Sequence, residues 1–170
     1  METQRDLVEQ ALQSAKLLWL LGPPGAGKTT WSKQQAKRLA GLRVVELGQL
    51  LAPFQLPNQG RPGMMRAKGA MIEALRALAH APEAPERFLV IVVDVPQESL
   101  CPVRPDECVL LLRPEPERWQ RQLSARPTRV APSATLEQAA DIDQRLQSWK
   151  HGLLRVSTDF DPSLLGQSSD

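Results

Sequence analysis

The 170-residue sequence predicts an α/β fold in which helices sandwich a parallel β-sheet in three layers. Short, uninterrupted apolar runs at residues 17–21, 88–93 and 109–112 are typical of strands that are buried on both faces of such a sheet. Segments with apolar residues at helical spacing separate these runs. A glycine-rich segment at residues 22–29 follows the first run directly, as expected for a turn that leads from a strand into a helix.

The first part of the chain alternates helix and strand. Helical spacing of apolar residues predicts a short amphipathic helix over residues 7–15, before the strand at 17–21. A second helix is expected over residues 30–39, because Gly41 supplies a stop signal after it. Residues 42–47 are then expected to form a second short strand.

Residues 52–80 are predicted to form an excursion between two strands of the sheet, made of an irregular loop followed by a helix. Proline and glycine recur from residue 52 to residue 63, which predicts an irregular loop. A helix is expected over residues 64–78, where apolar residues form a stripe and charged residues such as Arg76 are left for other faces. Prolines end this helix before the buried strand at 88–93.

The last part of the chain is predicted to add a strand, two helices and an edge strand. After the run at 109–112, an arginine-bearing helix is expected over residues 115–125 and a lid over residues 126–135. A long helix is expected over residues 136–154, and residues 155–157 are expected to form a final edge strand.

Composition excludes several classes of protein. The net charge of +2 provides no strong field that would recruit nucleic acid or a membrane. The polar N-terminus does not resemble a signal peptide, and the apolar runs are shorter than the roughly 20 residues that span a bilayer. Cys101 and Cys108 are therefore expected to be reduced thiols. We expect residues 1–170 to form one soluble, cytoplasmic domain.

The glycine-rich turn has the spacing of a phosphate-binding loop. Its backbone N–H groups and the N-terminus of the next helix are suited to bind phosphates, and Lys28 is expected to neutralise the β and γ phosphates. Thr29 offers a hydroxyl group to Mg²⁺. We assign nucleotide binding to the loop and the residue after it: Gly22, Pro23, Pro24, Gly25, Ala26, Gly27, Lys28, Thr29 and Thr30.

Other charged residues follow the predicted strands and helices. Asp94 comes at the end of a buried strand, where a carboxylate is expected to hold Mg²⁺ directly or through water; the alternative is a turn before Pro96. Arg126 and Arg129 lie in the predicted lid, from which they would stabilise the transferring phosphoryl group. Arg118 and Arg121 are expected either to join them or to lie on a solvated helix face.

The order of these features resembles the nucleoside-monophosphate-kinase-like branch of the P-loop proteins. That branch includes adenylate, shikimate and gluconate kinases and the polynucleotide-kinase-like phosphotransferases. The resemblance covers roughly residues 16 to 158. Besides the loop, it rests on Glu46-Leu-Gly-Gln-Leu-Leu51, which is similar in placement to an acceptor-holding turn, on Asp94-Val-Pro96, and on Asp141-Ile-Asp-Gln-Arg-Leu146.

The resemblance implies ATP as the phosphate donor, the excursion 52–80 as the acceptor side and Arg145 as a phosphate-contacting arginine. Glu46 would then face an acceptor hydroxyl group, or be only a solvated carboxylate at a strand end. Gln49 stands where the family has an aspartate, and Asp143 replaces an arginine, which favours an acceptor with less negative charge or an altered binding mode. The cationic residues of the excursion would grip an anionic acceptor or remain solvated: Arg61, Arg66 and Lys68.

These features together predict an ATP- and Mg²⁺-dependent phosphotransferase that acts on a small hydroxyl- or phosphate-bearing acceptor. Its expected catalytic residues are Lys28, Glu46, Asp94, Arg126 and Arg145. One alternative is a kinase of nucleic-acid 5′-hydroxyl groups, which the aromatic content of 4% and the lack of a long basic tract disfavour. The other is an ATP-binding switch module that acts through a protein partner, whose identity the sequence does not indicate.

Overall fold

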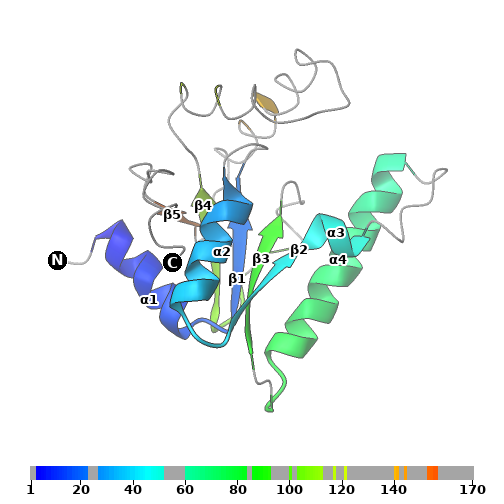
Figure 1. Cartoon of the computed structure of the whole chain (residues 1–170). Helices are drawn as coiled ribbons and strands as arrows, with labels where there is room; N and C mark the ends of the chain where they lie inside the picture. Colours follow the sequence, from blue (N-terminus) through cyan, green and yellow to red (C-terminus); the bar gives the residue numbers. More distant parts are fainter. Residues whose placement is uncertain are drawn as a thin grey trace.

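A computed structural model describes residues 3–22, 27–51, 60–83, 86–92, 100, 103–112, 117, 121, 140–141, 144 and 153–156. These residues form a five-stranded sheet with the strand order β2-β3-β1-β4-β5, and every neighbouring pair is parallel (Figure 1). The strands are β1 (Leu17–Leu21), β2 (Leu42–Glu46), β3 (Arg87–Val92), β4 (Glu107–Leu112) and β5 (Leu153–Val156). The helices are α1 (Gln4–Ser14), α2 (Lys28–Arg38), α3 (Leu47–Leu51) and α4 (Gly60–Ala79).

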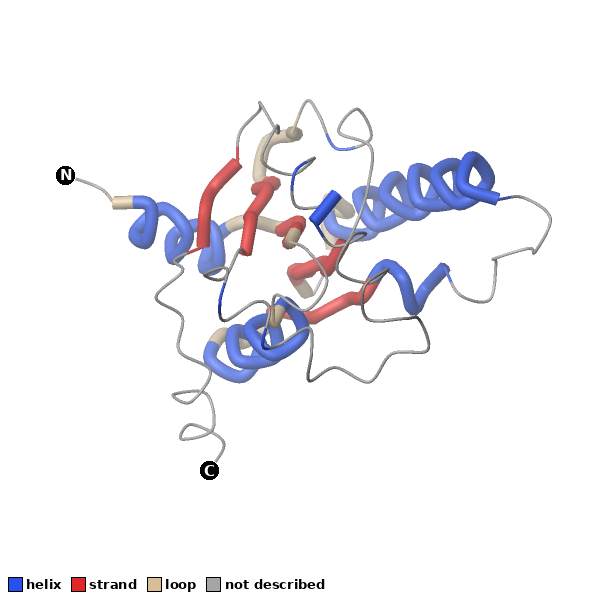
Figure 2. The backbone as a smooth tube through the Cα atoms, turned by 90° about the horizontal axis from the view of Figure 1, so that it is seen from above, coloured by secondary structure: helices blue, strands red, loops and turns tan. Residues whose placement is uncertain are grey.

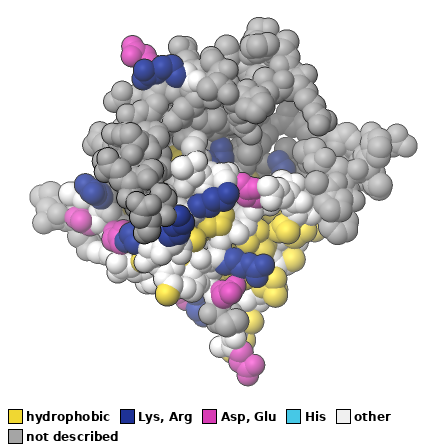
Figure 3. Space-filling view, viewed as in Figure 1, with side chains coloured by type: hydrophobic (Ala, Val, Ile, Leu, Met, Phe, Trp, Pro, Cys, Tyr) yellow, Lys and Arg dark blue, Asp and Glu magenta, His cyan; other side chains and the backbone are white. Residues whose placement is uncertain are grey.

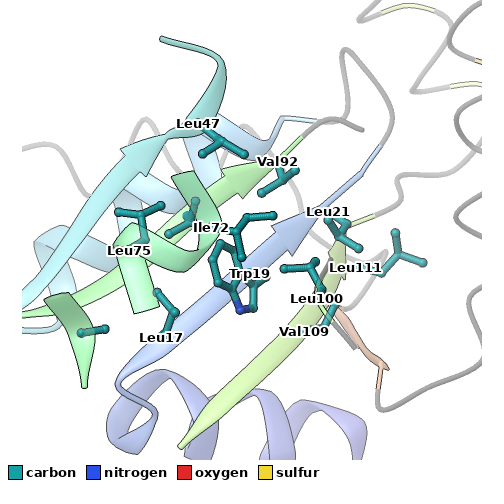
Figure 4. Close-up of a cluster of buried hydrophobic side chains, with 12 residues drawn as sticks. Leu17, Trp19, Leu21, Leu47, Ile72, Leu75, Val92, Leu100, Val109 and Leu111 are labelled. Carbon is teal, nitrogen blue, oxygen red and sulfur yellow. The ribbon is translucent and has the colours of Figure 1, made fainter. Parts of the chain in front are cut away.

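The helices cover both faces of the sheet, so the predicted three-layer α/β fold is confirmed (Figure 2). Every residue of the central strand β1 is buried, and its side chains alternate between two apolar clusters. Trp19 faces α4 and contacts the cluster that contains Ile72 (Figure 4). Leu18 and Leu20 instead face the cluster that Val8 of α1 and Trp31 of α2 complete.

Parallel pairing brings the carboxyl ends of the strands to one edge of the sheet. β1 ends at Leu21, β2 ends at Glu46 and β4 ends at Leu112. α2 and α3 both begin at this edge, directly after β1 and β2 in the chain order (Figure 1). Ligands of open α/β sheets bind at such an edge, so the functional site is expected there.

Some predicted boundaries are wrong. α4 begins at Gly60, whereas the helix was predicted to begin at residue 64. The earlier start is possible because a proline such as Pro62 is tolerated in the first turn of a helix, where its missing N–H has no intrahelical partner. β2 ends at Glu46, and Leu47 begins the short helix α3 instead of extending the strand. The last strand begins at Leu153, where a helix was expected, although its place at an edge of the sheet is as predicted.

Polar contacts stabilise both ends of α1. Thr3 and Asp6 form a capping box at its N-terminus. The guanidinium group of Arg87 donates hydrogen bonds to the carbonyl groups of Leu12 and Ala15 at its C-terminal end. No helix among the described residues is both long and apolar enough to cross a membrane.

A bidentate ion pair between Arg38 and Glu9 joins α2 to α1. We expect it to make a small, pH-dependent contribution to stability. Arg38 donates to both oxygens of Glu9, at 2.6 and 2.8 Å, and this contact lowers the pKa of the Glu9 carboxyl group. The stabilisation is therefore present above the unfolded-state pKa of Glu9 and is lost as the pH falls through its lower folded-state pKa. At pH 7, Glu9→Gln is expected to reduce the free energy of unfolding by about 0.2–1 kcal/mol in urea denaturation.

The pair between Arg43 and Glu86 supplies the control for this prediction. Its N–O distance is 3.6 Å and both side chains are well exposed, so Glu86→Gln is expected to change the free energy of unfolding less than Glu9→Gln does. As the pH is lowered from 7 toward 3, the difference in stability between Glu9→Gln and the unmodified protein should shrink. A difference between them that is the same at pH 7 and pH 3 would contradict the assignment to the Glu9 charge.

Candidate functional site

The chain leaves β1 through Gly22, which packs too tightly for any larger residue. A Cβ atom at Gly22 would lie 2.5 Å from the carbonyl oxygen of Leu112 and 3.2 Å from Cδ of Lys28. The glycine therefore lets the end of β1 pass between the end of β4 and the stem of the lysine.

Gly22→Ala is expected to lower the free energy of unfolding by about 1–3 kcal/mol, because the backbone of β4 must shift to accept the methyl group. Chemical denaturation measures this change. The control is Gly69→Ala in α4, where the added Cβ meets nothing within 4 Å and the helix gains up to about 1 kcal/mol. Equal stability of the two variants would show that the Leu112 carbonyl does not limit the size of residue 22.

Lys28 brings a buried positive charge to the start of α2. Only 6% of the residue is exposed, and its Nζ atom donates a hydrogen bond of 2.7 Å to the carbonyl oxygen of Gly22. Lysine is almost never buried unless its ammonium group has a partner. The side chain thus reaches back across the turn and holds its charge over the end of β1.

The N-terminus of α2 is left available to an anion. Gly27 occupies the N-cap position in the left-handed region, with φ 91° and ψ 21°, which favours glycine. No side chain among the described residues caps this end, and the first turn contains no acidic residue. The helix dipole and Lys28 therefore act in the same direction and favour negative charge here.

A hydroxyl and a carboxylate group meet beside this helix end. Thr29 on the first turn of α2 donates a hydrogen bond of 2.6 Å from Oγ1 to Oε1 of Glu46, the last residue of β2. Both residues are half-buried, and the hydrogen bond joins the Glu46 carboxylate to the first turn of α2. The two oxygens are of the kind that Mg²⁺ prefers.

The described residues hold no cluster of three or more His, Cys, Asp or Glu that would bind a metal ion unaided. The donor set at Thr29 and Glu46 nevertheless fits Mg²⁺, because in nucleotide sites this ion keeps several waters and takes its other ligands from phosphate groups. The Thr29 hydroxyl group and the Glu46 carboxylate, next to a site that favours phosphate, therefore match the few protein ligands that Mg²⁺ takes in such a site.

The structure places part of the predicted site and brings it together. Gly22, Gly27, Lys28, Thr29 and Glu46 lie at the carboxyl edge of the sheet, and Thr30 is exposed on α2. Basic side chains also lie over α2 on the face shown in Figure 3. The remaining predicted site residues lie outside the described part of the chain: Pro23, Pro24, Gly25, Ala26, Asp94, Arg126, Arg129 and Arg145.

A buried ionic cluster at the opposite edge of the sheet was not predicted. Arg76 was expected on a polar face of its helix, and this is wrong: its side chain is 5% exposed and contacts the fully buried carboxylate of Glu107. Nε2 of His80 lies 2.8 Å from the same carboxylate. The cluster begins at the first residue of β4, at the amino edge of the sheet, and therefore belongs to the scaffold.

Comparison with known proteins identifies similar solved structures. A sugar kinase from a Janibacter species is 17% identical, with a TM-score of 0.64 over 90% of this chain and 91% of that chain. Shikimate kinase from Acinetobacter baumannii, in complex with shikimate, is 17% identical, with a TM-score of 0.61 and 93% coverage of each chain. The tunicamycin resistance protein of Deinococcus radiodurans is 19% identical, with a TM-score of 0.58 over 90% and 92% of the two chains. No protein-family model and no curated protein sequence matches the chain.

These similarities establish the fold. The chain has the α/β fold of the P-loop small-molecule kinases, and it covers almost the whole length of the similar structures. The resemblance inferred from the glycine-rich turn and the order of elements is therefore confirmed at the level of fold.

Proposed function

We propose that the protein is an ATP-dependent kinase that transfers the γ-phosphate to a small hydroxyl- or phosphate-bearing acceptor. The observation that carries this proposal is the convergence of three features at one sheet edge: the buried Lys28 ammonium group, the uncapped N-terminus of α2 and the Thr29–Glu46 oxygen pair. Phosphoryl transfer requires little covalent chemistry from the protein and depends on positioning and on stabilisation of negative charge.

In this proposal the phosphates of ATP bind at the start of α2. Lys28 exchanges its contact with the Gly22 carbonyl for the β and γ phosphates, and the first-turn N–H groups hold the same anion. Thr29 and Glu46 would hold Mg²⁺, with Asp94 as a further ligand. When bound, Mg²⁺ neutralises charge on the phosphate oxygens as the transferring bond breaks.

The proposal gives the arginines and Glu46 different tasks. Arg126, Arg129 and Arg145 would supply positive charge to the equatorial oxygens of the transferring group. Glu46 lies within hydrogen-bond distance of Thr29, the other proposed Mg²⁺ ligand. This proximity favours a carboxylate that both binds the metal and contacts the acceptor hydroxyl group, over one that contacts the acceptor alone. Its carboxylate would orient the hydroxyl group for attack and accept its proton late in the transfer.

The test is transfer of label from γ-labelled ATP with Mg²⁺ to pools of sugars, sugar acids, hydroxy acids, nucleosides, nucleotides and 5′-hydroxyl oligonucleotides. Label in one small-molecule pool is expected. Label in the oligonucleotides alone would instead support a nucleic-acid kinase. Nucleotide binding with label released only to water or nowhere would overturn the proposal and favour a switch module.

Glu46→Gln tests the role of the carboxylate directly. The amide keeps an oxygen for Thr29 but loses the negative charge, so the Mg²⁺ concentration for half-maximal activity is expected to rise about tenfold or more. Glu86→Gln, at an exposed pair on β3's amino side, is the matched control and should leave the Mg²⁺ dependence unchanged. An unchanged Mg²⁺ dependence in Glu46→Gln would remove this residue from the metal site.

A further inference from the structure

The short helix α3 continues the candidate site from Glu46 and carries no charged residue. Its sequence is Leu-Gly-Gln-Leu-Leu over residues 47–51. Leu47 is buried in the apolar cluster below α4 and fixes the helix to the sheet. Gly48, Gln49 and Leu50 are exposed, so α3 has an exposed amide group, an exposed apolar side chain and a position without a side chain within four residues of Glu46.

Two details show that α3 has both room and apolar surface. A Cβ atom at Gly48 would meet nothing within 4 Å, so the space beside this residue is open. Leu50 is 39% exposed, one of two large apolar side chains that are exposed in the described part of the chain. Apolar side chains also gather on the side of the molecule where α3 and α4 lie (Figure 3).

The sequence extends this neutral character beyond α3. No residue from Leu47 to Gly60 is charged, although charged residues make up 24% of the chain. Residues 47–60 therefore include no cation that would neutralise an acid, and the next cation in the sequence is Arg61. Its polar side chains are amides, which donate and accept hydrogen bonds to hydroxyl groups without transferring charge.

We infer that α3 selects an uncharged, hydroxyl-bearing acceptor over a carboxylate or phosphate of the same skeleton. The inference rests on the proposed kinase function and adds the charge class of the acceptor. α3 itself carries no cation, so an anionic group placed against it would lose water without gaining a charged partner from this helix. An uncharged acceptor avoids this cost and contacts Gln49 and Leu50.

Arg66 is one of two described cations on α4, with Lys68, that were predicted to grip an anionic acceptor. It is exposed on α4, and α4 packs against α3. If the acceptor were anionic, Arg66→Ala would raise its KM by about tenfold, as expected for the loss of a charge-assisted contact. With an uncharged acceptor, Arg66→Ala should leave the KM within about twofold of the unmodified value.

The experiment compares acceptors that share a skeleton and differ in charge. Each neutral sugar or sugar alcohol is paired with its sugar acid and its sugar phosphate, and each nucleoside with its monophosphate. The kcat/KM for phosphorylation by ATP with Mg²⁺ is expected to be at least about tenfold higher for the neutral member of the preferred pair. A higher kcat/KM for the acid or phosphate overturns this inference and leaves the kinase function intact. Failure to phosphorylate any acceptor overturns both.

Gln49→Lys provides the reverse test on α3. The new cation should raise the ratio of acid to neutral kcat/KM by about tenfold, because it pairs with the anionic group beside Glu46. Gln13→Lys makes the same chemical change on the exposed face of α1 and should leave the ratio unchanged. Equal ratios in the two variants would show that the acceptor does not contact α3.

Discussion

Lys28→Ala is expected to reduce phosphoryl transfer by on the order of 10²–10³-fold or more, the loss seen when one preorganised charge-stabilising donor is removed. The structure provides the physical reason. The ammonium group is already desolvated, and it is held by the Gly22 carbonyl at the N-terminus of α2. A charge in this environment stabilises the transferring phosphate more strongly than a solvated lysine would, because less water screens it.

The measurement is steady-state transfer from γ-labelled ATP, combined with calorimetric titration of the nucleotide. Lys33→Ala is the matched control, since Lys33 lies on the same helix but is exposed. That variant should retain transfer and nucleotide affinity within a few-fold of the unmodified protein. Circular dichroism establishes that both variants are folded. Unchanged transfer by folded Lys28→Ala would show that ATP does not bind at this turn.

The sequence predicted the scaffold well where the signal is local. The run Leu17–Leu21 predicts a strand buried on both faces, and each of its residues is buried in the structure. The spacing of the glycine-rich turn likewise predicted a helix directly after it, and α2 begins at Lys28, two residues before the predicted start. Both predictions depend only on neighbouring residues, because strand burial and loop geometry leave a short periodic pattern.

Contacts that depend on strand order were not predictable. Thr29 and Glu46 are 17 positions apart. Glu46 ends β2, whereas Thr29 lies on the helix that follows β1, and β3 lies between these two strands in the sheet. The contact arises because the first turn of α2 crosses toward β2 at the carboxyl edge. A single sequence does not specify this order, so Glu46 remained open between a solvated carboxylate and a site residue.

The Arg76–Glu107 pair was missed for a related reason. The two residues are 31 positions apart, and each one occurs beside residues whose pattern is apolar. A charged residue within a helix stripe is usually solvated, which was the interpretation of Arg76. Arg76 can be buried because the Glu107 carboxylate on β4 pairs with it. The local sequence pattern around Arg76 does not indicate this distant partner.

Arg76→Met is expected to destabilise the protein by about 3–5 kcal/mol, because it leaves the Glu107 carboxylate buried without its principal counter-charge. Arg76 donates to both oxygens of Glu107, at 3.1 and 3.2 Å, and the Glu107 side chain is 0% exposed. Arg76 also donates to the Leu100 carbonyl, and it lies 5.8 Å from the ring of Trp19. Its loss therefore removes contacts that join α4 to β1, β4 and the segment at Leu100.

Urea denaturation at pH 7 measures the loss, and Arg104→Met is the matched control. Arg104 is 47% exposed and pairs only at the surface with Glu73, which Arg76 also contacts, so this variant should lose at most about 1 kcal/mol. Similar losses in the two variants would contradict the buried-charge explanation.

The double variant Arg76→Met with Glu107→Gln separates charge from packing. The amide that replaces the Glu107 carboxylate is neutral, yet it keeps an oxygen for the indole N–H of Trp19, which donates to Glu107 at 3.2 Å. Because replacing both members of a buried pair removes the uncompensated charge, the double variant should recover most of the stability that Arg76→Met loses. A double variant that is no more stable than Arg76→Met would mean that Arg76 acts through its contacts with Leu100 and Trp19, and not through the charge of Glu107.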